Sequence, residues 1–188
     1  VFTPDNSVIR KQLDGDKNDL PKFTSYMCGA IRPGHFSGVY RIVKFLFEIL
    51  EPNYAYFGKK DYQQLLLIKY IANTYFPKLK IIDVDTVRDS NNIALSSRLS
   101  KISRESIHQV KLIFQTLMMM KEKLLSGLDY KAVKESSLLD LEDNNISVEY
   151  LDLRSLDTLK EQVNINHPCG IFIACYIDNI RLIDNIEI

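Results

Sequence analysis

The sequence carries no surplus of charge of either sign, because 24 lysines and arginines balance 24 aspartates and glutamates. This balance argues against a basic nucleic-acid-binding protein and against an acidic tail protein. The sequence also lacks an apolar run approaching the roughly 18 to 20 residues of a membrane span, so we expect a soluble protein with no membrane partner. Its content of 46% hydrophobic and 26% charged residues is typical of a globular chain with a core of its own.

Cysteine is scarce as well. Cys28, Cys169 and Cys175 do not have the spacing of metal ligands, and their odd number leaves at least one thiol unpaired. This fits a reducing, cytoplasmic compartment better than a secreted disulfide scaffold. We therefore expect the cysteines to act as small buried hydrophobic residues, and we predict no metal site built from them.

The first half of the chain predicts an alternation of helices and strands. Apolar residues at helical spacing and short apolar runs predict helices at 39–50 and 61–75, and strands at 53–58 and 80–87. Pro52 ends the first helix, Gly58 ends the first strand, and Asp61 is a good N-cap for the second helix. This order predicts a right-handed crossover unit of a parallel sheet, with its functional loop at the carboxyl end of the strand.

The second half predicts a small α+β domain. A long amphipathic helix is expected at residues 103–125, beginning with a capping box at Ser103, and a second helix at 130–142. Alternating and apolar runs predict strands at 147–153, 171–177 and 180–183, the last two joined as a hairpin by Asp178-Asn179. We place the domain boundary after residue 97, which gives domains at 1–97 and 98–188.

The segment R-P-G-H-F-S-G at residues 32–38 stands directly before a predicted helix. Its proline and glycines fix an unusual backbone that presents Arg32 and His35 near a helix N-terminus, where anions bind. A purely structural turn would use the same residue types. We treat Arg32 and His35 as candidate residues of a ligand cleft.

The segment Y-F-G-K-K-D-Y-Q-Q at residues 56–64 combines a strand end with two lysines. Gly58 lets a ligand approach the backbone, and Lys59 and Lys60 follow where amide groups of the next helix add partial positive charge. A lysine is a natural point charge for a polyphosphate, and Gln64 lies one turn after Lys60, so that both side chains can face one ligand. A solvated pair of lysines is the alternative.

The segment A-L-S-S-R at residues 94–98 places two hydroxyl groups beside a guanidinium group. Ser96, Ser97 and Arg98 can grip phosphate oxygens from a loop between the domains. Such a loop can close over a ligand and stabilise charge that develops at an α-phosphate. A serine pair that caps a helix is the alternative.

Together these segments resemble one family, the pantoate–β-alanine ligases or pantothenate synthetases. RPGHFSGV, YFGKKDYQQLLLI, DTVRDSNNIALSSR and the terminal IRLIDN match the motifs of that family in order and separation. The resemblance covers nearly all of the chain and is weakest at residues 5–28 and in the middle of the second domain.

The resemblance implies an α/β fold. A partial Rossmann-like nucleotidylyltransferase domain with an incomplete parallel sheet would be followed by a small α+β lid domain, and members are usually homodimers through the first domain. They convert ATP and pantoate into an enzyme-bound pantoyl adenylate and pyrophosphate. The amine of β-alanine then displaces AMP, which gives pantothenate.

The resemblance also implies roles for single residues. Lys60 and Arg98 would be catalytic, because cations must screen the repulsion between the pantoate carboxylate and the α-phosphate, with Mg²⁺ as a third cation. Gln64 would bind pantoate, and Arg32 and His35 would lie on the nucleotide side of the cleft. The residues expected to contact ATP are Gly58, Lys59, Lys60, Asp61, Val87, Leu95, Ser96, Ser97 and Arg98.

Several departures from the family pattern qualify the resemblance. Lys59 replaces a usual glutamate, Leu95 a common methionine, Leu99 a usual asparagine and Asp85 a usual proline. The family's first segment, with its H-x-G-H signature, a further pantoate-binding glutamine and the first strands of the sheet, does not occur in this sequence. His35 does not replace that signature, because RPGHF matches a different family element.

We therefore expect the chain to be the C-terminal part of such a ligase, catalytic only together with the first segment. A non-catalytic remnant or interaction module with residual nucleotide affinity is the main alternative. A related adenylyl transferase with another acid substrate is a further alternative, which Gln64 disfavours.

Overall fold

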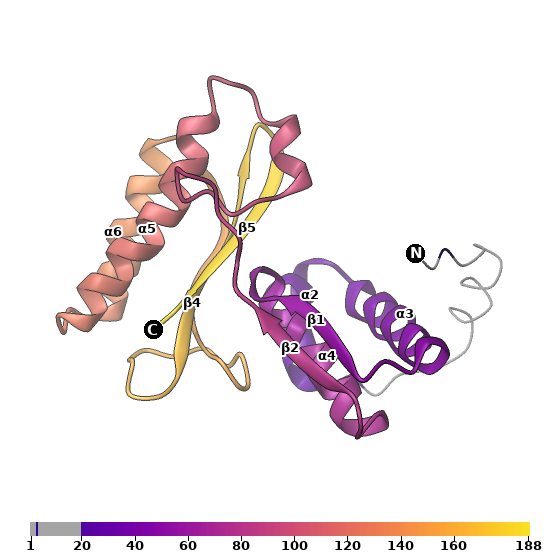
Figure 1. Cartoon of the computed structure of the whole chain (residues 1–188). Helices are drawn as coiled ribbons and strands as arrows, with labels where there is room; N and C mark the ends of the chain where they lie inside the picture. The colour runs from indigo at the N-terminus through magenta and orange to yellow at the C-terminus, as the bar shows by residue number, and fades with distance from the viewer. Residues whose placement is uncertain (1–2, 4–19) are drawn as a thin grey trace. The chain divides into compact units, whose positions relative to one another are not determined.

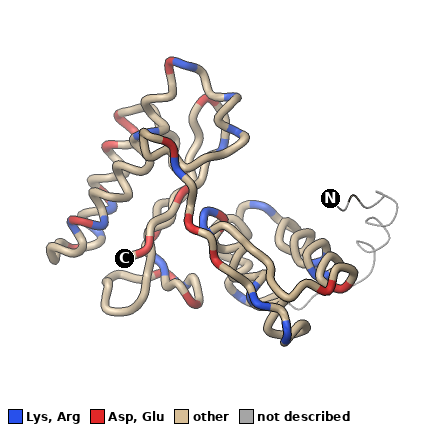
Figure 2. The backbone as a smooth tube through the Cα atoms, in the orientation of Figure 1, with Lys and Arg blue, Asp and Glu red and all other residues tan. Residues whose placement is uncertain are grey.

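The computed structural model describes residue 3 and residues 20–188, and the chain divides into two compact units (Figure 1). The first unit is Val1–Val84 and the second is Asp85–Ile188. Each unit has a cluster of buried hydrophobic residues of its own. Basic and acidic residues are interspersed along the backbone of both units, in line with the balanced composition (Figure 2).

The first unit is built around two parallel strands. β1 and β2 pair with Tyr54 opposite Lys80 and Gly58 opposite Val84, and α4 makes the connection between them. The parallel pairing predicted from the helix–strand–helix–strand order is thereby confirmed. Its elements are η1 (Lys22–Ser25), α2 (Met27–Ile31), α3 (His35–Leu50), β1 (Tyr54–Gly58), η2 (Lys59–Asp61), α4 (Tyr62–Tyr75) and β2 (Lys80–Val84).

One face of this two-stranded sheet packs against α3 and α4. Ala55 and Phe57 of β1 and Ile81 of β2 contact the buried cluster that the two helices share. The alternate residues of β1, Tyr54 and Tyr56, are exposed. Parallel sheets are usually covered on both faces. In this unit, the described residues cover one face of the β1–β2 sheet and leave the tyrosines of the other face exposed.

The second unit packs two helices on one face of an antiparallel sheet with strand order β3-β4-β5 (Figure 1). β4 is buried along nearly its whole length because it is the central strand. Asp178 and Asn179 both have positive φ, 51° and 59°, as a two-residue hairpin turn requires. The elements are η3 (Ser97–Lys101), α5 (Ile107–Leu125), α6 (Tyr130–Asp143), β3 (Ser147–Ser155), β4 (Cys169–Ile177) and β5 (Ile180–Glu187).

The predicted elements are present, with shifted ends and two capping errors. α5 begins at Ile107 rather than at residue 103, because the Ser103 hydroxyl accepts a hydrogen bond from the Ser106 amide in a turn that precedes the helix. Asp61 occupies the N-cap position of α4, but its side chain makes no capping hydrogen bond. The capping role expected of Asp61 is therefore wrong.

The α/β expectation is confirmed, since a parallel and an antiparallel sheet occupy separate units. Residues 85–97 belong to the second compact unit, and the domain boundary after residue 97 stays a prediction. Cys169 and Cys175 are buried and Cys28 is half-buried, all three as free thiols. Within the described residues, no helix is both long and apolar enough to cross a membrane.

Candidate functional site

The first group of candidate residues lies at the carboxyl end of β1. Gly58 is the last residue of the strand, η2 carries the lysines, and α4 follows at once. A methyl group added at Gly58 would meet no described atom within 4 Å, so a ligand can approach the backbone here. Lys59 and Lys60 are half-buried and Asp61 is exposed. The fold therefore presents cationic side chains and helical amide groups at one strand end, which suits a phosphate.

The two neighbouring glutamines of α4 lie in different environments. The side chain of Gln63 is buried, at 5% exposure, and its Nε2 donates to the backbone oxygens of Phe23 and Tyr26, both at 2.8 Å. Gln64, the expected pantoate residue, is half-exposed, and its side chain has no hydrogen-bond partner among the described residues. Gln64 thus remains available to a ligand, whereas Gln63 holds the segment before α3 in place.

Arg32 and His35 lie next to each other. Nη1 of Arg32 is 3.2 Å from Nε2 of His35, and both side chains are exposed or nearly so. Gly34 adopts φ of 79°, a left-handed conformation that glycine tolerates without strain, and it occupies the N-cap position of α3. The R-P-G-H segment therefore does form a turn that presents both side chains at a helix N-terminus.

The second group of candidate residues begins in a tight loop of the second unit. Arg88 and Ala94 form an isolated antiparallel bridge, and the Leu95 amide donates to the Val87 oxygen at 2.9 Å. This bond places Val87 and Leu95 side by side. Both are exposed, at 62% and 52%, which leaves them accessible to a ligand.

Asp89 closes this loop. Its Oδ1 accepts hydrogen bonds from the amides of Ile93 and Asn91, at 2.9 and 2.8 Å. The bond from the Ile93 amide is the main cause that lowers the pKa of Asp89 below its ordinary value. Asn92 has φ of 63°, which asparagine tolerates better than most residues. The loop conformation is thus specified locally by its own polar residues.

Ser96, Ser97 and Arg98 follow directly. The Ser96 hydroxyl accepts from the Arg98 amide at 3.2 Å and so caps η3, which is the structural role considered for the serine pair. Ser97 and Arg98 are exposed. The guanidinium group of Arg98 donates from Nη1 to the backbone oxygen of Arg181 on β5, at 2.9 Å. The Arg98 side chain is therefore held against β5, while Ser97 stays accessible.

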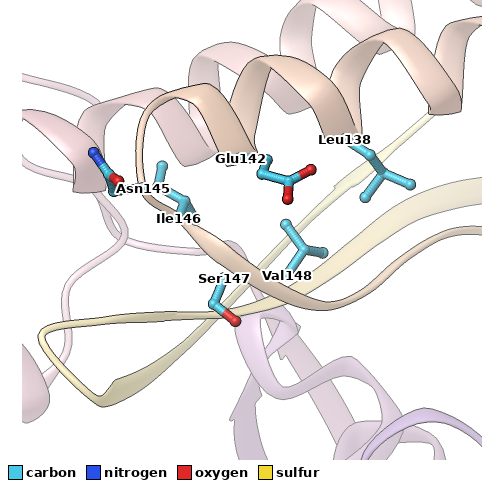
Figure 3. Close-up of a pocket in the computed structure, with 6 residues that line it drawn as sticks. All are labelled: Leu138, Glu142, Asn145, Ile146, Ser147 and Val148. Atoms are coloured by element: carbon cyan, nitrogen blue, oxygen red, sulfur yellow. The ribbon is translucent and has the colours of Figure 1, made fainter.

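Two further features of the described residues concern pockets and groups of side chains that could bind a metal ion. An open pocket of about 600 Å³ lies between the end of α6 and the start of β3, and none of the residues that line it is a predicted site residue (Figure 3). Its lining is Leu138, Glu142, Asn145, Ile146, Ser147 and Val148. Among the described residues, no group of three or more histidine, cysteine or acidic side chains can hold a metal ion.

The comparison with known proteins decides the family. The model of the family described as Pantoate-beta-alanine ligase matches residues 1–187. The chain belongs to the pantoate–β-alanine ligase family. Its curated relatives include the pantothenate synthetases of Leptospira interrogans, 34% identical over all of this chain and 67% of the relative, and of Shewanella baltica, 36% identical with the same coverage.

Solved structures of pantoate–β-alanine ligases are similar as well. Pantothenate synthetase from Thermus thermophilus aligns with a TM-score of 0.82 at 31% identity, over 88% of this chain. The enzyme from Francisella tularensis, solved with beta-gamma ATP and β-alanine, aligns with a TM-score of 0.70 at 30% identity, over 90% of this chain. This chain spans 60% and 57% of the lengths of those two proteins.

The sequence patterns assign no role to two side chains that form buried or charged contacts within these motifs. Gln63 is the neighbour of the expected pantoate residue, and Arg88 lies within the DTVRDSNNIALSSR motif. Arg88 makes a two-pronged ion pair with Asp184, at 2.7 and 2.8 Å, across 96 positions of the sequence. An arginine between a strand end and a polar loop was the only signal, and it did not identify the partner.

Proposed function

We propose that this chain carries the ATP- and pantoate-binding motifs of a pantoate–β-alanine ligase. The reaction is the condensation of pantoate with β-alanine through a pantoyl adenylate, with release of pyrophosphate and AMP. Catalysis requires, in addition, the H-x-G-H segment that this sequence does not contain. The observation that carries the proposal is the juxtaposition of Gly58, Lys59, Lys60 and Gln64 at one strand end, in a chain that belongs to this family.

Lys60 and Arg98 are the proposed catalytic residues. Attack of the pantoate carboxylate on the α-phosphate brings two anions together, and pyrophosphate leaves with additional negative charge. Fixed cations lower the energy of that transition state because they face charge where it develops. The short distance along the chain between Gly58 and Lys60 supports this role, since the open backbone and the charge belong to one turn.

The remaining roles follow the same motifs. We propose that Gln64 binds pantoate, because its half-exposed side chain has no described protein partner. Arg32 and His35 are proposed to lie on the nucleotide side of the site. The residues proposed to contact ATP are Gly58, Lys59, Lys60, Asp61, Val87, Leu95, Ser96, Ser97 and Arg98.

We propose Mg²⁺ only as the ion that accompanies ATP. The described residues offer no cluster of protein ligands for it, which fits an ion held mainly by phosphate oxygens and water. Bound in this way, Mg²⁺ would supply positive charge near the departing pyrophosphate. β-Alanine as the second substrate, a homodimer as the assembly and a cytoplasmic location complete the proposal, all by analogy with the family.

The decisive test is pantoate-dependent exchange of pyrophosphate into ATP. It is run on this chain and on the same chain joined to the first segment of a relative such as the Thermus protein. Exchange in the joined protein only, abolished by Lys60→Met, is the expected result. Exchange in neither protein would contradict the proposal and favour a non-catalytic remnant, and exchange with other acids but not pantoate would indicate a related adenylyl transferase.

A matched control separates charge from folding in this test. Lys69 lies on the same helix as the proposed site, but it pairs with Asp83 of β2 at 2.6 Å. Lys69→Met removes a lysine of similar exposure without touching the motif. We expect Lys69→Met to keep pyrophosphate exchange within about threefold of the parent protein, since partly exposed ion pairs contribute little to stability.

A further inference from the structure

Arg88 and Asp184 form an ion pair at the start of the segment of residues 87–98, which is proposed to contact ATP. The Asp184 side chain is 5% exposed, and both of its oxygens accept from the Arg88 guanidinium group. The guanidinium carbon also lies 4.0 Å from the centre of the Phe114 ring of α5. A planar guanidinium held by a carboxylate and an aromatic face is restricted in orientation, which restrains the position of residue 88.

The same guanidinium group also contacts its own loop. Nη1 donates to the backbone oxygen of Asn92 at 3.1 Å, within the turn that Asp89 closes. Arg88 is thereby bonded at once to β5 and to the tip of the loop that leads to Leu95. A change in this side chain would affect the position of the whole loop, and not only the strength of one contact.

β5 holds the segment of residues 87–98 at both ends. Asp184 binds Arg88 at the start, and the backbone oxygen of Arg181, three positions earlier on the same strand, binds Arg98 at the end. Between these two anchors, Ile93 is buried in the hydrophobic core. Val87, Leu95 and Ser97 are left exposed between or beside the anchored residues.

We propose that the Arg88–Asp184 ion pair positions the ATP-contacting residues of this loop without contacting the nucleotide itself. This inference rests on the proposed function of residues 87–98. Arg88 is thus a positioning residue, which acts through the hydrogen bond that joins Val87 and Leu95. The pair keeps Val87, Leu95 and the residues up to Arg98 in one arrangement before ATP binds, so that less ordering is required on binding.

The first measurement is amide hydrogen exchange of the 188-residue chain. In Arg88→Lys, which keeps the charge but loses the fork, we expect the Leu95 and Ile93 amides to exchange about tenfold faster, because exchange reports local opening. Asp184→Asn removes the carboxylate partner of a largely enclosed guanidinium, so it tests folding together with loop position. The double variant Arg88→Met/Asp184→Leu removes both charges together and replaces them with apolar side chains, which buried pairs often tolerate.

The matched control is Asp152→Asn. Asp152 is buried on β3 of the same sheet and accepts from Lys134 and Arg154, at 3.0 and 2.6 Å, but it has no bond to residues 87–98. Its loss lowers the melting temperature without opening the loop. Unchanged exchange at Leu95 in the Arg88 variants, or the same increase in Asp152→Asn, would overturn the inference.

The second measurement is the dissociation constant for ATP in the joined protein used for pyrophosphate exchange. We expect Arg88→Lys and the double variant to bind ATP about tenfold more weakly, a typical effect for residues that couple to a site without contacting the ligand. The dissociation constant in Asp152→Asn is expected to be unchanged. Unaltered ATP affinity in the Arg88 variants would overturn the inference alone, whereas a parent protein that binds no ATP would overturn the proposed function.

Discussion

Gln63 and Gln64 are adjacent and identical in chemistry, but under the proposed function only Gln64 binds a substrate. Gln63 donates to the backbone oxygens of Phe23 and Tyr26, while its Oε1 is buried without a hydrogen-bond partner in the described structure. Gln64 is half-exposed. Substitutions at the two positions therefore separate stability from pantoate binding.

The cost of Gln63→Met is the difference between two effects. It removes two hydrogen bonds, each contributing about 1 kcal/mol, but it also removes a buried oxygen whose unmet desolvation costs about 1 kcal/mol or more. The oxygen of Tyr26 retains the Gly29 amide at 2.8 Å, and that of Phe23 retains a weaker bond from the Tyr26 amide, so neither is left without a donor. We expect a net loss of about 1 kcal/mol.

Gln63→Glu is expected to cost considerably more, about 3 kcal/mol or above at neutral pH, because an ionised carboxylate donates nothing and would face two carbonyl oxygens. This variant therefore buries an unpaired charge. The fold favours the protonated carboxyl group and raises its pKa above the unfolded value of about 4.3. The folded state therefore binds this proton more tightly than the unfolded state does. The loss of stability grows as pH rises from the unfolded pKa to the folded pKa, and it shrinks at lower pH.

The assay is urea unfolding of each variant at about pH 4.5 and about pH 7.5, on either side of the expected titration, with pantoate-dependent pyrophosphate exchange in the joined protein. Gln64→Met and Gln64→Glu serve as the matched pair and are expected to change stability by less than about 0.5 kcal/mol, as surface substitutions usually do. They should instead raise the KM for pantoate. The reasoning is refuted if the Gln64 variants lose as much stability as the Gln63 variants, or if Gln63→Glu costs no more than Gln63→Met at about pH 7.5, where the carboxylate is ionised in the unfolded state.

Burial and charge lead to three further predictions. Burial alone would raise the pKa of Asp152, but hydrogen bonds from Arg154 and Lys134 outweigh it and lower the pKa. The stability that this carboxylate contributes is therefore present above about pH 4 and is lost as pH falls further. We expect Asp152→Asn to make the free energy of urea unfolding less dependent on pH in this acid range. Because burial raises the pKa of Cys175 to about 12, a maleimide at about pH 7.5 should label Cys28 first and Cys175 only after unfolding, as mass spectrometry of peptides would show. The exposed face and edges of the β1–β2 sheet should make this chain self-associate in sedimentation velocity, and a monodisperse monomer at micromolar concentration would count against that expectation.

The sequence predicted elements whose cause is local. Helical spacing located α3, α4, α5 and α6, and apolar runs located the strands, because burial of one face requires that spacing wherever the element lies. The start of α5 could not be predicted in the same way. Both carboxylate oxygens of Asp178, in the β4–β5 turn, bind Ser103 and Ser106, and these partners are more than 70 positions away.

The same distinction between local and long-range causes applies to the candidate site. Gly58, Lys60 and Gln64 could be proposed from the sequence because they lie close together in it, at the end of β1, in η2 and in the first turn of α4. The environments that distinguish Gln63 from Gln64 depend on contacts with residues about 40 positions away, and the pair of Arg88 and Asp184 spans 96 positions. Pattern reasoning finds residue types and spacing, whereas burial of a polar group and the identity of its partner require the fold.

Burial along residues 87–98 provides the physical basis for separating support from contact. Ile93 and Ala94 are buried and Arg88 is mostly enclosed by its partners, so their substitution changes the free energy of unfolding. Val87 and Leu95 are largely exposed, so their substitution by alanine should leave stability within about 0.5 kcal/mol. If ATP binds here, the same two alanine variants must weaken it, because a ligand that covers an exposed apolar side chain gains roughly 25 cal/mol for each Å² removed from water. In this loop, Arg88 and Ile93 hold the backbone and Val87 and Leu95 face the solvent. We therefore expect alanine at Val87 or Leu95 to weaken ATP binding without loss of stability, and substitution of Arg88 to reduce both together.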